Sequence, residues 1–419
     1  MYLLKSGLIL ILVCVFADAE AQTLDAYVDS ALKNNPALKM YNFQSEALQQ
    51  KIKPAKALDD PMLFVGIMNL PVNFSFTQDE MTMTQIGIQQ NFSIKKKYSL
   101  NGDVLQKEYE ASLYDIDVQR LSLIKEIKQS YYDIYAQTKT IETTLSSIEA
   151  LKNYIQIANA RYAAGYGTQQ DVFKAQVEIS KMQGELISME SMKKDMIAIF
   201  NSLLYRNKND SVNIPENIKF QKVDLNMDAI MMDVEMNNPI LLSLQKNISK
   251  DSVAYQLAKT SKIPDFNTSL WYGRRQAEMA DGRKAKDMLG FSFGLTLPIY
   301  AKKKQNPLIT ASAINIQTSQ SRLETAQNEF ELMAHHALID VNKNEQLVSF
   351  YSEQLIPQAT ESLHAGLTGY QENKIDFMTL IDNYLSLYNY QLQYDQAIAD
   401  YYKAIAELEM ITGRKLTMQ

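Results

Sequence analysis

The sequence of 419 residues predicts a mainly helical protein with a smaller β portion, built from two structural repeats. One observation is internal repetition. The tripeptide NNP occurs at 34–36 and again at 237–239, and an alternating apolar stretch that runs into three lysines occurs at 87–97 and at 294–304. A second observation is helical periodicity over segments far longer than an ordinary globular helix. Together they predict that each repeat contributes a strand pair and a long antiparallel pair of helices.

The N-terminus is typical of a secretory signal peptide. Lys5 precedes an apolar run at 7–16, and the small-residue sequence ADAEAQ follows it. We therefore expect residues 1–21 to be removed on export. The single cysteine, Cys14, lies inside this segment, which excludes disulfides and cysteine nucleophiles from the mature chain. Lipidation of Cys14 is the weaker alternative, because Val13 stands where a small residue is expected.

Composition and hydropathy limit where the protein can reside and which partners it can bind. The formal net charge of −6 argues against nucleic acid as a partner. Beyond the signal peptide there is no run of about 18 apolar residues, so the sequence predicts no transmembrane helix. An exported chain without such a helix resides in the periplasm, outside the cell, or in an outer membrane that β-strands cross.

The two repeats are expected at 22–215 and 216–419, each with two long helices. In the first repeat a segment at 98–161 has no proline, and its apolar residues recur every three or four positions. At 1.5 Å per residue it would be roughly 95 Å long, more than a globular domain of this size can hold, which predicts an extended coiled-coil-like assembly. The other helices are expected at 171–204, at 308–365 with a kink at Pro357, and at 376–412.

Each helix pair is joined by a turn with a distinct sequence. The stretch RYAAGYGTQQDV at 161–172 places Gly165 and Gly167 after the first long helix, where we expect the left-handed conformation that ends many helices. In the second repeat Asn373 falls where Gly165 aligns, and asparagine is the next-best residue for that conformation.

Four strand candidates lie between these helices, at 62–71, 83–94, 266–273 and 287–300. The last is the clearest, because large apolar residues such as Phe291 alternate with small or polar ones. This alternation is typical of a strand between lipid and a wet lumen, although a half-buried strand in a soluble sheet gives a similar pattern. Four such strands in an exported chain favour a membrane β-barrel. Because closed membrane barrels need about eight strands, we expect a trimer that shares a twelve-stranded barrel.

Taken together, the sequence resembles the TolC-like outer-membrane factor family, the exit ducts of tripartite efflux pumps and type I secretion systems. The resemblance rests on the repeated NNP, the strand pairs, the turn motifs and the closing sequence AIAELEMITG. It implies a homotrimer whose β-barrel lies in outer-membrane lipid and continues into an α-helical tunnel in the periplasm. It also implies a periplasmic adaptor (membrane fusion) protein and an RND-type or ABC-type transporter of the inner membrane as partners.

By position, the resemblance implies a periplasmic gate at the helix tips. Tyr370 matches the tip tyrosine and Asp171 the aspartate that it bonds, while Asp382 matches an aspartate that lines the constriction. A ring of such carboxylates would favour cations. The family's tip arginine aligns with Ile375, so we expect fewer polar links in the closed gate. Asp376 is a further gate candidate, but it and Asp171 each begin a helix, where capping is the alternative role.

The resemblance also places an adaptor-docking groove at the first turn and its counterpart in the second repeat. The residues that it implies for adaptor contact are Gly165, Tyr166, Gly167, Thr168 and Asn373.

The two lysine runs are expected to mark the periplasmic edge of the barrel. Each run follows the second strand of its repeat and precedes a long helix. Lysine side chains extend to the interface and face lipid phosphates, because burying the charge in hydrocarbon is costly. A direct role in substrate passage is the alternative. The predicted membrane-interface anchors are Lys95, Lys96, Lys97, Lys302, Lys303 and Lys304.

Substrate class is indicated only weakly by the sequence. The chain has 20 methionines, and thioethers are ligands suited to Cu(I), but methionine more often fills gaps in a core. The stretch DPMLFVGIMNLPV at 60–72 resembles family members paired with heavy-metal pumps. We therefore expect efflux of heavy-metal cations or small toxic compounds. The alternatives are the exit duct of type I protein secretion, and an exported structural coiled coil with no channel.

Enzymatic chemistry is not predicted. The sequence has no glycine-rich phosphate loop and no nucleophile elbow, so we expect no cofactor and energy supplied by a partner. His335 and His336 are adjacent on a helix and do not share a face, and His364 lies far along the chain. These spacings do not form a chelating pair, so no metal site is predicted.

Overall fold

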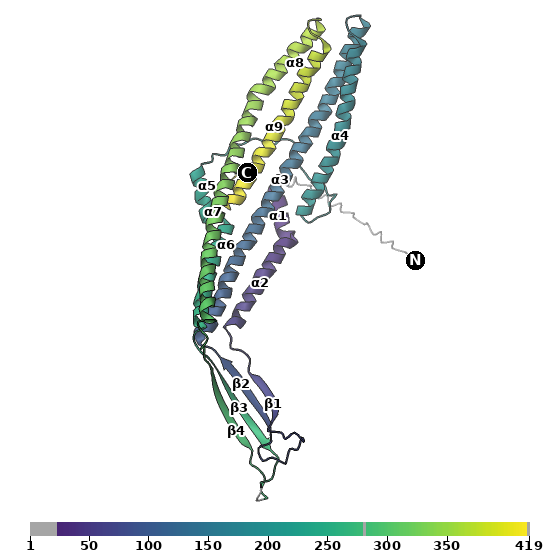
Figure 1. Cartoon of the computed structure of the whole chain (residues 1–419). Helices are drawn as coiled ribbons and strands as arrows, with labels where there is room; N and C mark the ends of the chain where they lie inside the picture. Colours follow the sequence, from purple (N-terminus) through teal and green to yellow (C-terminus); the bar gives the residue numbers. More distant parts are fainter. Residues whose placement is uncertain (1–22, 280–281, 417–419) are drawn as a thin grey trace, which may run out of the picture. The chain divides into compact units, whose positions relative to one another are not determined.

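The computed structural model describes residues 23–279 and 282–416. The expected signal peptide at 1–21, with Cys14, lies outside the described residues. The fold is mainly helical with one four-stranded antiparallel sheet, as the sequence predicts (Figure 1). In the described part of the chain, none of the helices combines the length and the hydropathy of a transmembrane segment.

Contacts divide the chain into two compact units, and each unit draws on both halves of the sequence. The units therefore differ from the repeats expected at 22–215 and 216–419, and the repeat boundary stays a prediction. In described residues, unit 1 consists of 23–35, 123–222 and 341–406, and unit 2 consists of 36–122, 223–340 and 407–416.

The helices fall into three groups by unit. Unit 1 contains α1 (Leu24–Asn34), α4 (Gln169–Leu203) and α8 (Ile356–Gln371). Unit 2 contains α2 (Pro36–Lys56), α5 (Met227–Asn237) and α6 (Pro239–Thr260). The three longest helices contribute residues to both units: α3 (Lys95–Ala163), α7 (Gln305–Phe350) and α9 (Phe377–Thr412).

The helix expected at 308–365 is interrupted just before its proline. After α7 the chain passes through a π-helical turn, Tyr351–Leu355, and continues as α8. Pro357 stands in the first turn of α8, so it has no N–H to donate to the carbonyl of Glu353, and its ring crowds that carbonyl. In the wider π turn, the missing hydrogen bond and the crowding by the proline ring fall outside the regular α-helix. The kink expected at Pro357 is therefore a π turn immediately before it.

The repeated NNP has the same structural role in both places. In unit 2, Asn238 caps α6 by accepting hydrogen bonds from two backbone N–H groups of its first turn, and its Nδ2 donates to the carbonyl of Ile411 in α9 at 2.8 Å. In unit 1, Nδ2 of Asn35 donates to the carbonyl of Leu203 in α4 at 3.5 Å. In each case the proline that follows occupies the first helical position, which lacks an N–H partner in any helix. The second asparagine thus ties a helix start to the end of another helix.

The sheet lies in unit 2, with the strands in chain order (Figure 1). Its strands are β1 (Met62–Met68), β2 (Met83–Phe92), β3 (Asp265–Arg275) and β4 (Met288–Thr296). The first and last are shorter than expected at 62–71 and 287–300. Asn69 adopts a positive φ of 53°, which ends β1, and Pro298 cannot donate to a ladder beyond β4.

One face of the sheet is apolar and exposed across all four strands. Paired residues of neighbouring strands share a face, and Val65, Ile86 and Tyr272 form one row of such pairs. A continuous apolar surface of this kind is unfavourable in water and indicates contact with lipid or with another chain. The residues of this face that are between 44% and 73% exposed are Leu63, Val65, Ile67, Ile86, Ile88, Leu270, Tyr272, Leu289, Phe291, Phe293 and Leu295.

The opposite face combines glycines with a few large side chains. A Cβ at Gly290 would lie 2.2 Å from the Trp271 indole, so that ring lies directly over the glycine. A Cβ at Gly87 would lie 2.5 Å from Phe64 Cζ and 2.8 Å from the carbonyl oxygen of Leu270. The glycines on this face therefore leave the space that its two aromatic side chains occupy.

We expect Gly87→Ala to destabilise the sheet by about 1–3 kcal/mol, because the added methyl group overlaps a backbone carbonyl that cannot move aside. The measurement is the thermal unfolding midpoint of the purified protein. Gly66→Ala is the matched control, since its Cβ would meet only Gln85 Nε2 at 3.8 Å, an ordinary contact. Equal midpoints for the two variants would contradict this account of the glycine face.

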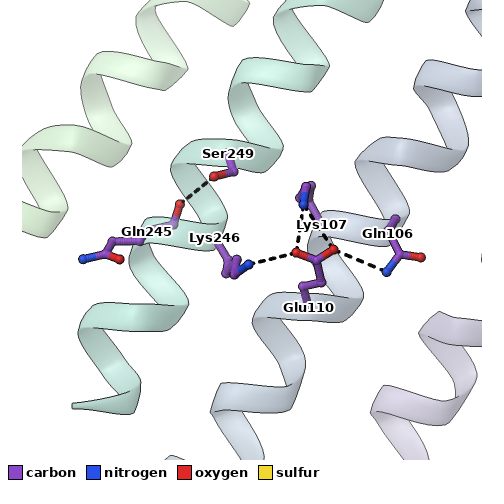
Figure 2. A network of polar contacts seen from close by, with 6 residues as sticks. All are labelled: Gln106, Lys107, Glu110, Gln245, Lys246 and Ser249. Atoms are coloured by element: carbon purple, nitrogen blue, oxygen red, sulfur yellow. Dashed lines mark hydrogen bonds and ion pairs between the residues drawn. The ribbon is translucent and has the colours of Figure 1, made fainter. Parts of the chain in front are cut away.

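A charged network joins α3 to α6 within unit 2. Glu110 accepts hydrogen bonds from Lys107 Nζ at 2.9 Å and from Lys246 Nζ at 3.0 Å, and Figure 2 shows both lysines directed at its carboxylate. Gln106 Nε2 donates to the same carboxylate at 3.4 Å. The bonds from Lys107 and then Lys246 lower the pKa of Glu110 from 4.5 to about 2. The network therefore favours the ionised carboxylate.

This depressed pKa predicts how stability depends on pH. A carboxylate with a lowered folded-state pKa contributes its full stability above about 4.5 and loses it as the pH falls through about 2. We expect Glu110→Gln to lower the unfolding midpoint at pH 7, and the difference from wild type to shrink between pH 4.5 and 2. The control is Glu149→Gln, which removes an exposed pair within one helix and should have little effect at any pH. A pH-independent difference for Glu110→Gln would exclude this electrostatic origin.

Candidate functional site

The predicted gate residues lie at two turns of unit 1, where α3 meets α4 and where α8 meets α9 (Figure 1). Below the turns the four helices share one buried core, in which Tyr154 and Tyr384 meet edge to face at 5.3 Å between ring centroids. Further along, the hydroxyl groups of Thr144 and Tyr388 form a buried hydrogen bond of 2.9 Å. This core holds the two helical hairpins side by side up to the turns.

The α3–α4 turn follows the Schellman pattern. Gly165 has a φ of +78°, and the N–H of Tyr166 donates to the carbonyl of Arg161 at 2.9 Å. The left-handed conformation predicted for Gly165 is therefore confirmed. For Gly167 the same prediction is wrong, since Gly165 and Gly282 are the only glycines of positive φ before Gly413 in the described residues. A glycine is required at position 167 because the backbone of α3 lies close to it. A Cβ at this position would lie 3.1 Å from the backbone nitrogen of Tyr162.

The α8–α9 turn repeats the pattern with asparagine. Asn373 has a φ of +62°, as its alignment with Gly165 predicts, and the N–H of Lys374 donates to the carbonyl of Gly369 at 2.8 Å. Asp376 follows and accepts a hydrogen bond from the N–H of Thr379 at 2.8 Å. That bond lowers the pKa of the Asp376 carboxyl. Asp376 thus has the bonds of a helix cap, which is the alternative role considered for it.

Asp171 both caps a helix and faces the other hairpin. With Thr168 it forms the capping box of α4, in which the Thr168 hydroxyl donates to Asp171 Oδ1 at 2.8 Å. Its second oxygen, Oδ2, accepts a hydrogen bond from the Tyr370 hydroxyl at 3.5 Å, which is long for an O–H···O bond. Burial, and then the Asp171 charge, raise the pKa of the Tyr370 phenol, so the hydroxyl remains a donor. The predicted Tyr370 and Asp171 pair is thus brought together within one chain.

A residue that the sequence analysis did not select makes the stronger link. Arg161, in the last turn of α3, donates to the Tyr370 carbonyl and to Asn373 Oδ1, and to the Tyr166 carbonyl at 3.2 Å. Its guanidinium also lies 4.3 Å from the centroid of the Tyr370 ring, in cation–π range. One side chain therefore bonds both turns. The sequence did offer a clue to this role. Arg161 lies at the end of a helix beside a glycine turn, where the several N–H donors of a guanidinium can reach backbone carbonyls that have no partner within the helix.

The position expected to carry an arginine has a different function. Ile375 packs its side chain on α8, and a Cβ at Gly369 would lie 3.5 Å from Ile375 Cγ2. Arg161, on the opposite hairpin, bonds this turn instead, so the two turns share more polar contacts than the sequence suggests. Asp382 is exposed on α9, next to the buried Ile381. Its assignment to a constriction stays a prediction.

The surface predicted for adaptor contact is open. Tyr166 is 69% exposed, and nothing lies within 4 Å of a Cβ placed at Gly165. Thr168 and Asn373 are also exposed. In the described ranges there is no group of three or more His, Cys, Asp or Glu side chains that could hold a metal ion. The two turns of unit 1 are thus joined by hydrogen bonds, and the backbone around them is accessible.

The predicted interface lysines lie in unit 2, at both junctions between strand and helix. Lys95 and Lys96 are exposed in the first turn of α3, while Lys97 forms an ion pair with Asp265 at 2.7 Å, at the start of β3. Residues 302–304 form an exposed turn before α7. Five of the six lysines are therefore available to bind anions, and Lys97 instead ties a strand to a helix.

We expect Arg161→Ala to loosen the tip. Amide hydrogen exchange in the turn at 372–375 should accelerate about tenfold, because hydrogen bonds to charged groups contribute about 1.5–3 kcal/mol and this side chain is partly exposed. Arg161→Lys keeps the charge but not the planar fork, so it should restore only part of the protection. Amides of the turn at 207–210 in the same unit are the internal control. Unchanged exchange at 372–375 would show that Arg161 does not hold the turns together.

The chain is similar to one family model and to several known proteins. Residues 27–195 match the family model described as outer membrane efflux protein. The cobalt-zinc-cadmium resistance protein CzcC of Cupriavidus metallidurans is 20% identical over 306 residues, which are 69% of this chain and 67% of that protein. The toxin and drug export protein A of Aggregatibacter actinomycetemcomitans is 23% identical over 248 residues, 58% of this chain and 51% of that protein.

Solved structures share the fold. The outer-membrane channel OprN superposes with a TM-score of 0.78 at 13% identity, covering 93% of this chain and 89% of that chain. CusC superposes with a TM-score of 0.78 at 13% identity, covering 93% and 92%. The outer membrane protein VceC of Vibrio cholerae has a TM-score of 0.76 at 14% identity, covering 94% and 97%. At these identities the likeness establishes the fold alone.

Proposed function

Because residues 27–195 match the family model described as outer membrane efflux protein, we propose that the chain is the outer-membrane duct of a tripartite efflux system. The observation that carries this proposal is the exposed apolar face of the four-stranded sheet, combined with an opposite face of glycines, polar residues and a few large side chains. Such a sheet suits lipid on one side and a wet lumen on the other. The duct is passive, and an inner-membrane transporter supplies the energy.

The proposed assembly is a homotrimer with a twelve-stranded barrel in the outer membrane and a helical tunnel in the periplasm. Among the residues that the structure describes, β1 pairs only with β2 and β4 only with β3, so each subunit leaves two strand edges to be completed. Unpaired backbone groups are costly in lipid, which favours closure by neighbouring copies. In this arrangement the lysines at 95–96 and 302–304 face lipid phosphates at the periplasmic edge.

The proposed gate is the pair of turns in unit 1. Tyr370, Asp171 and Arg161 hold the two hairpins together, and a periplasmic adaptor that docks beside Gly165 and Tyr166 would compete for the same turn. Asp382, exposed on α9, would supply one carboxylate per subunit to a cation-selective constriction. Opening then requires the Arg161 bonds to break, since they join the two hairpins directly.

Heavy-metal cations or small toxic compounds are the proposed substrates. The name of the matched resistance protein, which specifies cobalt, zinc and cadmium, favours metals, and its match extends over two thirds of both chains. A duct for protein secretion is the second candidate, favoured by the match to a toxin and drug export protein. A structural coiled coil without a channel is disfavoured, because it has no use for a sheet with an exposed apolar face.

The decisive experiment deletes the gene and measures sensitivity to Co²⁺, Zn²⁺, Cd²⁺, Ag⁺, dyes and detergents. We expect increased sensitivity, restored by the wild-type gene, and a heat-sensitive trimer extracted only from the outer membrane. The Arg161→Ala gene should restore export while admitting bulky antibiotics, because its gate closes less firmly. Unchanged sensitivity to all compounds would favour secretion over efflux. A soluble periplasmic monomer would overturn the duct itself.

A further inference from the structure

One row of the sheet alternates aromatic side chains with glycines. Across the four strands, the directly paired residues of this row are Phe64, Gly87, Trp271 and Gly290. All four belong to the face opposite the exposed apolar one. We propose that Phe64 and Trp271 form a flat aromatic surface that binds planar aromatic cations, the chemical class of cationic dyes.

The two glycines allow both rings to lie along the sheet. A Cβ at Gly87 would lie 2.5 Å from Phe64 Cζ and 2.6 Å from Trp271 Cβ, so the tip of the Phe64 ring reaches the base of the Trp271 side chain. A Cβ at Gly290 would lie 2.2 Å from both Cε2 and Cζ2 of Trp271, so the indole lies over this glycine. Each ring therefore extends over the next strand, and both extend in the same direction across the row.

Both rings keep one side open. Phe64 and Trp271 are half-buried rather than buried. The backbone of a glycine lies against one side of each ring, so the exposed part is the side that faces away from the sheet. A ring that is already held in place loses little conformational freedom when a ligand stacks on it. The row is therefore a preformed contact surface.

The surroundings of the row favour recognition by ring faces rather than by charged groups. The two flanking rows contain no charged side chain, since they consist of Gly66, Gln85, Gly273 and Met288 on one side and of Met62, Gln89, Ser269 and Ser292 on the other. Arg275 lies two rows away, and its guanidinium donates to the carbonyls of Lys286 at 2.5 Å and Glu80 at 3.2 Å. The negative face of an aromatic ring attracts a cation, and a planar ring system adds stacking. A planar aromatic cation gains both interactions, whereas a cation without a ring gains only the first.

This surface would lie on the lumen side of the proposed duct, so its use in export rests on that function. Binding to the purified protein rests only on the geometry of the sheet. A protein that binds a planar cation without exporting it would uphold the aromatic surface and refute the duct. A protein that exports such a cation without binding it at Trp271 would refute the surface and uphold the duct.

The experiment titrates the full-length protein, purified in detergent, with ethidium and follows tryptophan fluorescence. Trp271 is the single tryptophan of the chain, so its emission reports on this row. We expect saturable quenching that an excess of tetraethylammonium, a cation without a ring, does not reverse. Reversal by tetraethylammonium would show that charge alone is recognised and would overturn the proposal. So would quenching no stronger than that of N-acetyltryptophanamide in the same detergent.

Two variants alter the surface and keep the tryptophan as reporter. Gly290→Ala places a methyl group where the indole lies and should weaken ethidium binding about fivefold, which is within the range for loss of one aromatic contact. Phe64→Leu removes the second ring and should weaken binding about twofold or more. It tests the surface even where Gly290→Ala disturbs the fold, as circular dichroism will show.

The matched control is Gly66→Ala, one row away on the same face, which should bind ethidium like the wild type. A Cβ at Gly66 would meet only Gln85, at 3.8 Å, and would leave both rings in place. Equal affinities of Gly290→Ala, Phe64→Leu and wild type for ethidium would overturn the proposal, and the two rings would then serve packing only.

Discussion

The two open edges of the four-stranded sheet are the constraint on which the rest of the structure depends. β1 and β4 each present one row of backbone N–H and C=O groups without a partner strand in the described part of the chain. Beside these edges lies an apolar face that water solvates poorly. In an apolar medium unpaired backbone groups cost several kcal/mol each, which is why we propose closure of the sheet by other copies. In that proposal the long helices that continue from the strands follow the geometry of the closure.

Alternate residues of each strand form the two faces of the sheet, and the two faces pack differently. On the apolar face large side chains stand side by side and point away from the chain. On the other face glycines at 87, 273 and 290 leave room for Phe64, Trp271 and Met83 to lie flat. In the proposed barrel this face lines the lumen, which bulky side chains on every strand would fill. Above Gly273 the Met83 thioether and the Trp271 indole lie close together.

At the helix tips, residues that stabilise a turn also link two hairpins. Asp171 caps α4 and accepts the bond from Tyr370, while Arg161 ends α3 and bonds the turn after α8. Capping and linking therefore do not compete as explanations, because a carboxylate has two oxygens and a guanidinium has a fork of donors. A turn held in this way can be released by a partner that offers the same groups other bonds. In the proposed gate these residues would therefore both stabilise a turn and control opening.

The sequence by itself determined the class of fold, the order of the four strands and of the long helices, and two of the left-handed backbone positions. Periodicity and repetition are local properties, so α3, α4, α9 and the alternation in β4 could be read from residue order, as could the left-handed Gly165 and Asn373. The pairing of Tyr370 with Asp171 came from resemblance to a family, and periodicity alone could not supply it. Tertiary structure alone decided that the Arg161 side chain bonds the turn between α8 and α9, and that Met68, Met83 and Met288 lie at one end of one face. Those relations join residues far apart in the chain, and only strand register and helix packing determine which side chains meet.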